Sequence, residues 1–292
     1  MSLAARPDEH APAWLVWTAL WVVYLMWGST YLAIRILVET IPPLLGAGVR
    51  FIAAGLIMHA VLFVRRGPRG ASLSLKELGA ATLVGALLLL GGNGLVTVAE
   101  QEVPSGLAAL IVASVPLWVV LLRAVFRDRV GRPTLLATLV GFVGVAILVL
   151  PGGGSGDVSL GGLLTVVAAS TFWAAGSFLS KYLPLPDDPF RSTAVQMLAG
   201  GVVTVLMALV VGESRGLEMS DLSAASIWAF VYLVFAGSLF AFTAYTWLLQ
   251  HAPISKVATY AYVNPVVAIF LGWLILDELI SPAIALGATV IV

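Results

Sequence analysis

Eight stretches of this sequence, each 20 residues or longer, contain no aspartate, glutamate, lysine or arginine. They are residues 11–34, 78–99, 103–122, 133–156, 158–180, 192–212, 222–255 and 257–276. A helix needs about 20 apolar residues to cross roughly 30 Å of hydrocarbon, so each stretch has the length of a membrane span. A β-barrel is excluded, because its strands alternate in segments of about 10 residues. We therefore predict an all-α polytopic membrane protein.

Two weaker stretches complete the predicted set of ten transmembrane helices. Residues 44–64 are interrupted by Arg50, and residues 282–292 stop at the end of the chain. Ten spans use about 200 residues, which leaves only connections and termini from the 292 residues of the chain. Charged residues make up 10% of the sequence, against about a quarter in soluble domains. No soluble domain is expected beside the spans.

Composition also excludes several kinds of chemistry. The sequence has no cysteine, so it can form neither a disulfide nor a cysteine-ligated metal site. The three histidines, His10, His59 and His251, lie far apart in sequence, and we expect no metal and no cofactor. A net charge of zero without a basic run argues against a nucleic-acid partner. Because no acid, base or metal cluster appears, we predict that the protein is not an enzyme.

The distribution of lysine and arginine predicts the orientation in the membrane. If residues 1–13 are cytoplasmic, 12 of the 15 basic residues fall on the cytoplasmic side and only Arg215 falls in an outer loop. Basic residues favour the cytoplasmic side of short loops. We therefore predict that both termini face the cytoplasm of a bacterial-type inner membrane.

The sequence also resembles itself at two offsets. A shift of 149 residues superposes Gln101 on Gln250, Pro104 on Pro253, Pro116 on Pro265, Asp128 on Asp277 and Pro133 on Pro282. A shift of 146 superposes Trp27 on Trp173, Arg35 on Lys181, Pro43 on Pro189 and Arg50 on Gln196. Five spans per copy is an odd number, so the second copy enters the membrane from the opposite side. We predict two inverted five-helix repeats, residues 1–150 and 151–292, around a central cavity.

Four segments resemble the drug/metabolite transporter superfamily and, within it, the EamA family of ten-span exporters. They are WGSTYLAIR at 27–35, PPLLGAGVRFIAAG at 42–55, GNGLVTVAEQEVPSGLAALIVASVP at 92–116 and TYAYVNPVVA at 259–268. The resemblance implies an inner-membrane carrier that exports amino acids or related small metabolites, with ten helices around a central cavity. This sequence departs from the family's pattern at the last helix. Residues 282–292 reach only about 16 Å, so we expect that helix to be truncated.

Polar and aromatic residues inside the spans are the candidate substrate contacts, because polar groups in a membrane usually face a bundle interior or a wet cavity. Several share one helical face, such as Asn93 with Thr97 and Tyr260 with Asn264. Interhelical hydrogen bonding is the alternative role for each serine or threonine. The predicted substrate-binding residues are Tyr24, Trp27, Asn93, Thr97, Ser114, Trp173, Ser177, Tyr245, Tyr260 and Asn264.

Pro116 and Pro265 occupy the same place in the two predicted copies. A proline inside a helix removes one N–H donor and clashes with the carbonyl four residues earlier. We predict that these two prolines act as symmetric hinges in alternating access, with a static kink as the alternative.

No aspartate or glutamate occupies the middle of any predicted span. This absence favours small, net-neutral substrates and leaves open whether transport is proton-coupled, through His59 or Glu100, or passive. The alternatives are a multidrug or cation efflux carrier and a sugar-phosphate-type antiporter. The latter would need a deep lysine or arginine, whereas Arg35, Lys181 and Lys256 lie near predicted helix ends. The expected partners are a small-molecule substrate and the lipid bilayer, and the expected state is a monomer.

Overall fold

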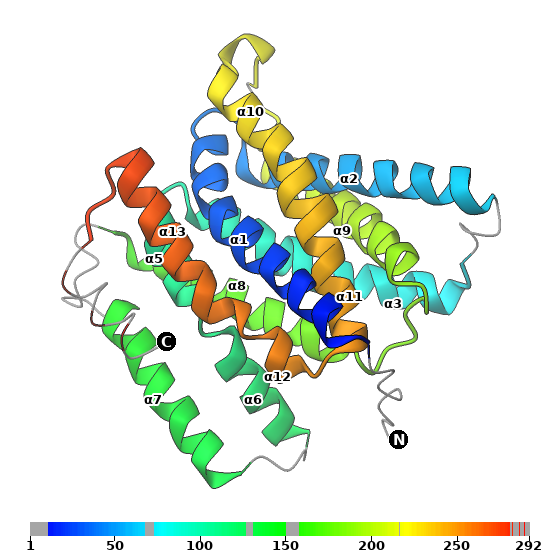
Figure 1. Ribbon diagram of the computed structural model, residues 1–292. Helices are drawn as coiled ribbons and strands as arrows, with labels where there is room; N and C mark the ends of the chain where they lie inside the picture. The colour runs from blue at the N-terminus through cyan, green and yellow to red at the C-terminus, as the bar shows by residue number, and fades with distance from the viewer. Residues whose placement is uncertain are drawn as a thin grey trace.

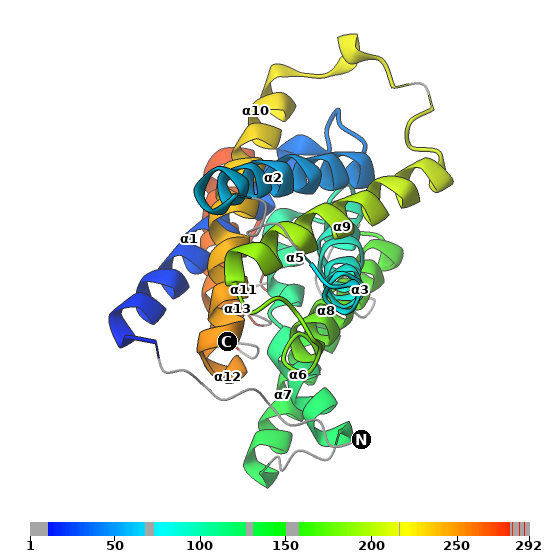
Figure 2. The same ribbon diagram turned by 90° about the vertical axis from the view of Figure 1, so that its right-hand side faces the viewer.

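The computed structural model describes residues 11–67, 73–126, 131–149, 158–215 and 217–280, with residues 282, 286 and 289. Every regular element in these ranges is a helix (Figures 1 and 2). Eight helical spans among the described residues are long and apolar enough to cross a membrane. Hydrocarbon offers no hydrogen-bond partners to the backbone, and a helix pairs its own backbone N–H and C=O groups. The prediction of an all-α, multi-span membrane protein is confirmed.

The helices follow the charge-free stretches of the sequence. The first half contains α1 (Ala13–Leu37), α2 (Pro43–Arg66), α3 (Leu75–Gly85), η2 (Ala86–Gly94), α4 (Leu95–Ala99), α5 (Ser105–Val112), α6 (Val115–Val125) and α7 (Arg132–Val149). The second half contains α8 (Leu160–Leu179), α9 (Pro189–Val211), η3 (Met219–Asp221), α10 (Ala224–Tyr232), η4 (Leu233–Phe242), α11 (Thr243–His251), α12 (Ile254–Val257) and α13 (Tyr260–Leu276). Four of the eight spans combine shorter elements, namely α3–η2–α4, α5–α6, α10–η4–α11 and α12–α13.

The count of ten spans stays a prediction. Helix α7 is a shorter apolar helix that lies at the edge of the bundle, where it contacts α6 and α8 (Figure 1). The predicted tenth span, residues 282–292, falls almost entirely outside the described residues, as does the predicted boundary between residues 150 and 151.

Two π-helical segments, η2 and η4, interrupt otherwise α-helical spans. Segment η4 begins 147 residues after η2 and ends 148 residues after it, between the two offsets of the predicted repeat. A π-turn widens a helix locally and is frequent at functional sites. The two segments are therefore compatible with the predicted internal repeat, and they mark the places where each half departs from regular helix.

Helix α9 packs against both α2 and α3 through glycines. A Cβ atom on Gly200 would lie 2.7 Å from the carbonyl oxygen of Gly85, and one on Gly201 would lie 2.9 Å from the carbonyl oxygen of Gly48. Small residues let helix backbones approach closely in membranes. This contact places α2 beside α9, as Figure 2 shows, and brings the second and seventh predicted spans together.

Carboxylates that follow two helices of the second half cap helix starts in the first half. Glu213, which follows α9, accepts hydrogen bonds from the backbone N–H groups of Leu44 (3.2 Å) and Leu45 (2.9 Å) at the start of α2. Glu278, which follows α13, accepts hydrogen bonds from the N–H groups of Ser105 (2.9 Å) and Gly106 (3.2 Å) at the start of α5. Both satisfy donors that a helix start leaves unpaired.

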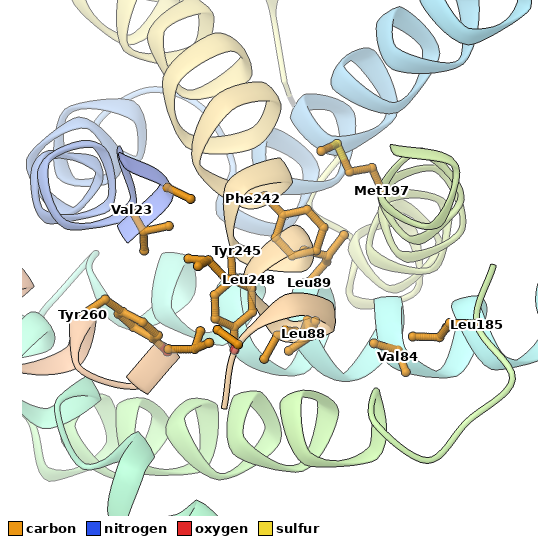
Figure 3. Close-up of a cluster of buried hydrophobic side chains, with 14 of the residues drawn as sticks. Val23, Val84, Leu88, Leu89, Leu185, Met197, Phe242, Tyr245, Leu248 and Tyr260 are labelled. Atoms are coloured by element: carbon orange, nitrogen blue, oxygen red, sulfur yellow. The ribbon is translucent and has the colours of Figure 1, made fainter. Parts of the chain in front are cut away.

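The largest cluster of buried apolar side chains lies where the two π-containing spans meet α1 and α13. Figure 3 shows Leu88 and Leu89 of η2 beside Phe242 and Tyr245 of the later span, with Tyr260 of α13 on the opposite side of Tyr245. Helices α1 and α13 lie side by side (Figure 1). This cluster is one boundary of the cavity described next.

Candidate functional site

A cavity of about 630 Å³, counted with its open mouth, lies inside the bundle. Its walls come from α1, α2, η2, α4, α5, α8, η4 and α13, so both halves of the chain contribute. The lining residues are Trp27, Thr30, Tyr31, Ile34, Arg50, Phe51, Gly92, Asn93, Val96, Val112, Ala169, Ser170, Trp173, Gly237, Phe242, Tyr260 and Asn264. Small-molecule sites are typically lined by apolar side chains with a few convergent polar groups, as this cavity is.

Trp27 is the centre of an aromatic wall. Its ring packs edge-on against Trp173 (5.3 Å between centroids, 84°) and Tyr260 (5.3 Å, 80°), and lies 4.8 Å from Tyr245. Edge-to-face packing of this kind is favourable between aromatic rings. The indole Nε1 of Trp27 donates a hydrogen bond to the carbonyl oxygen of Gly237 in η4 (3.1 Å). The wall therefore joins α1, α8, η4, α11 and α13.

The π-helical segment η2 makes room for this wall. A Cβ atom on Gly92 would lie 2.5 Å from Cε3 of Trp173, closer than atoms in contact approach. Only a residue without a side chain lets the indole of Trp173 lie against η2. The widened helix and its glycine together shape the side of the cavity formed by α8.

Arg50 is the one charged residue among the described residues that line the cavity. It is 3% exposed, and its Nη2 donates a hydrogen bond to Oδ1 of Asn93 (2.6 Å). Its guanidinium also lies over the ring of Phe51, 4.3 Å from the centroid. Arg50 is not among the binding residues predicted from the sequence. The available signal was a lone arginine in an apolar stretch, because such a charge in a membrane normally marks a functional site.

Glu100 ends α4 and is completely buried. Neither of its carboxylate oxygens has a hydrogen-bond partner among the described residues. Nη1 of Arg35 donates to the backbone carbonyls of Glu100 and of Gln101, the latter at 2.8 Å. The interior therefore holds a carboxylate at the end of a span, although the middle of each span has none.

The sequence profile of the EamA-like transporter family matches residues 14–150 and 160–292. The chain belongs to this family. It is 39% identical over 277 residues to YedA, described as an uncharacterized inner membrane transporter of Escherichia coli strain K12, covering 93% of this chain and 87% of that protein. It is 26% identical over 271 residues to the uncharacterized transporter YoaV of Bacillus subtilis strain 168, covering 92% and 91%.

A solved crystal structure shares the fold, with a TM-score of 0.68 over 94% of this chain and 93% of that one, at 20% sequence identity. The expected resemblance to the EamA family is confirmed. The chain is a multi-pass inner-membrane transporter, as the resemblance to this family implied.

Five of the ten predicted binding residues line the cavity of this EamA-family transporter. They are Trp27, Asn93, Trp173, Tyr260 and Asn264. With its nitrogen placed as the donor, the amide of Asn264 hydrogen-bonds the carbonyl oxygens of Tyr260 and Tyr24, both at 3.1 Å. The structure thus brings these five side chains together, and their role in binding stays a prediction.

The other five predicted residues lie outside the cavity lining. The hydroxyl groups of Tyr24 and Thr259 are hydrogen-bonded at 2.6 Å. The hydroxyl of Tyr245 is hydrogen-bonded to the hydroxyl of Ser177 (2.5 Å) and accepts a hydrogen bond from the indole N–H of Trp173 (3.2 Å). Thr97 donates to the carbonyl of Asn93 (2.8 Å). Ser114 is fully buried, and its hydroxyl has no partner among the described residues.

The two predicted hinge prolines have different surroundings. Pro116 lies in the first turn of α6, directly after the interruption between α5 and α6. Pro265 lies inside the continuous helix α13, whereas the interruption of that span comes earlier, between Val257 and Tyr260. The two prolines therefore stand at different distances from the interruption of their spans. Their role as hinges remains a prediction.

Proposed function

We propose that this transporter exports amino acids or related small, net-neutral metabolites by alternating access. The proposal depends mainly on one observation, the aromatic wall around Trp27 beside the amides of Asn93 and Asn264. The amides and hydroxyl groups can donate and accept hydrogen bonds to both ends of a zwitterion. The electron-rich faces of the aromatic rings attract the ammonium group of an amino acid, and they can also contact its apolar side chain.

Two hydrogen bonds beside the cavity support the proposal of alternating access, because each joins two helices that would have to separate. The bond between Tyr24 and Thr259 joins α1 to the start of the last described span, and the bond between Ser177 and Tyr245 joins α8 to α11. In the predicted orientation these contacts lie on the cytoplasmic side of Trp27. Separation of these helices would open a path to the cavity from that side.

The cation-efflux alternative has no support in the cavity lining. No acidic side chain occurs among the described lining residues, and the single charged group there is the cation of Arg50. One observation favours a sugar-phosphate-type antiporter: such a protein needs a basic residue deep in the cavity, and Arg50 lines it. A phosphate dianion, however, is usually held by several charged or N–H donors, and one guanidinium matches a carboxylate better.

Reconstitution in liposomes tests the proposed function. We expect uptake of at least one member of a panel of labelled amino acids above that of empty liposomes, measured with and without a pH gradient. Replacement of Trp27 by phenylalanine removes the hydrogen bond to Gly237 and should slow this flux severalfold. Trp228→Phe is the matched control, because Trp228 is exposed on α10. No flux of any amino acid would count against the proposal.

A further inference from the structure

We propose that Arg50 is the specificity-determining residue of the cavity and binds a carboxylate group of the substrate. This inference rests on the proposed function, since it assumes that the cavity is the substrate site. It adds the chemical group that every good substrate must carry.

The first step concerns the position of the charge. Arg50 lies on α2, which has no aspartate, glutamate, lysine or other arginine between Pro43 and Phe63. A guanidinium inside a membrane is costly and persists where it serves a partner or a cavity. Arg50 is nearly inaccessible to solvent yet lines the cavity, so a ligand in the cavity is the partner that can reach it.

The second step concerns unused donors. A guanidinium carries five N–H donors in a planar fork. Nη2 of Arg50 donates to Asn93, whereas Nε is buried without a hydrogen-bond partner among the described residues. A carboxylate can accept two parallel hydrogen bonds from such a fork. The uncharged amide of Asn93 leaves this capacity available, which an aspartate at the same place would not.

The third step concerns the charge of the cavity lining. No acidic side chain occurs among the described lining residues, and no hydrogen bond joins the buried Glu100 to Arg50 among the described residues. Glu100 therefore does not occupy the donors of Arg50 that Asn93 leaves available. A bound carboxylate would complete this arrangement, whereas a bound amine would add a second cation next to Arg50.

Binding to the purified full-length protein in detergent tests the assignment. The probes are matched pairs that differ at the carboxylate: L-phenylalanine with L-phenylalaninamide, L-leucine with L-leucinamide, and 3-phenylpropanoate with phenethylamine. We expect the acids to raise the melting temperature and the amides and the amine to have little effect. Arg50→Gln should weaken binding of the acids at least tenfold, and Arg50→Lys should retain part of it.

Two further variants separate binding from folding. Asn93→Asp would place a permanent carboxylate against Nη2 of Arg50, so it should also weaken binding of the acids at least tenfold while keeping the arginine. Arg66→Gln is the matched control on the same helix, because Arg66 is half-exposed and pairs with Asp188 outside the cavity. It should leave the preference for acids unchanged.

The outcomes distinguish this proposal from the proposed function. Binding of 3-phenylpropanoate through Arg50 without flux of any amino acid would contradict the proposed function and support the carboxylate site. Equal amino-acid flux in the wild type and in Arg50→Gln would support the proposed function and contradict the carboxylate site. The carboxylate assignment is overturned if amides bind as tightly as acids, if inorganic phosphate binds more tightly than any carboxylate, or if no probe binds.

Discussion

Gly200 of α9 faces the backbone of α3 so closely that a Cβ atom there would lie 2.7 Å from the carbonyl oxygen of Gly85. The contact is between two backbones, so neither side can give way by changing a rotamer. It fixes the distance between α9 and the span that carries η2, and hence one wall of the cavity.

Replacement of Gly200 by alanine should therefore destabilise the protein. Inserting a methyl group into a filled contact typically costs about 1–3 kcal/mol. We expect a lower melting temperature in detergent and a lower affinity for any substrate. Gly79→Ala is the control, because nothing lies within 4 Å of a Cβ atom there and alanine favours a helix over glycine. Equal effects of the two substitutions would contradict the close backbone contact.

Tyr245→Phe removes one hydroxyl group that joins three side chains. The hydroxyl binds Ser177 at 2.5 Å, and the indole Nε1 of Trp173 donates to it at 3.2 Å. We expect a loss of about 1 kcal/mol in the free energy of unfolding, since the indole N–H loses its acceptor. Tyr232→Phe is the control, because its hydroxyl binds Ser29 at an exposed position. Denaturant titration of both variants would test the difference.

The ion pair between Arg66 and Asp188 predicts a dependence of stability on pH. Partial burial raises the pKa of Asp188, but hydrogen bonds from Arg66 and from the backbone of Arg191 and Phe190 outweigh it and hold the pKa below its usual value. A carboxyl group with a lowered pKa stabilises the folded state above its unfolded pKa of about 3.9. That contribution is lost as the pH falls through the lowered value.

Asp188→Asn isolates this contribution, because asparagine is also a good N-cap and the side chain of Asp188 caps α9. We expect the wild type to be more stable than the variant at pH 6 and the difference to shrink below about pH 4. A difference that grows as the pH falls would contradict the assignment. The pair is partly exposed, so high salt should also reduce the difference.

The helical spans could be predicted because each charge-free stretch must satisfy its backbone within hydrocarbon. The segment Ala86–Gly94, by contrast, carries no sequence signal that separates a π-helix from an α-helix. The change depends on packing, since Gly91 and Gly92 face Phe172 and Trp173 of another span. Contacts between distant segments decide such local geometry, and the sequence does not show them.

The candidate site was predictable only in part for a similar reason. Helical spacing placed Asn93 and Thr97 on one face, but it did not show that Thr97 would bond to the carbonyl of Asn93. A threonine in a helix often bonds to the carbonyl four residues earlier, and Thr97 takes this structural role. The partner of Arg50 lies 43 residues away in sequence, so only the fold reveals it.

Glu278→Gln tests the connection between the end of one half and a helix start in the other. The carboxylate of Glu278 accepts hydrogen bonds from the N–H and the hydroxyl of Ser105 and from the N–H of Gly106. A negative charge at a helix start contributes about 1 kcal/mol in a partly buried position. We expect Glu278→Gln to lower the free energy of unfolding by about this amount, measured by denaturant titration.

Glu218→Gln is the matched control for Glu278→Gln, because Glu218 is exposed and its hydrogen bond to Ser220 is long, at 3.4 Å. Its effect should be within about 0.5 kcal/mol of zero. The cap also holds α5 against the end of α13, which are two sides of the same cavity. If Glu278→Gln changed neither stability nor the rate of substrate flux, the carboxylate would not contribute to holding these two spans together.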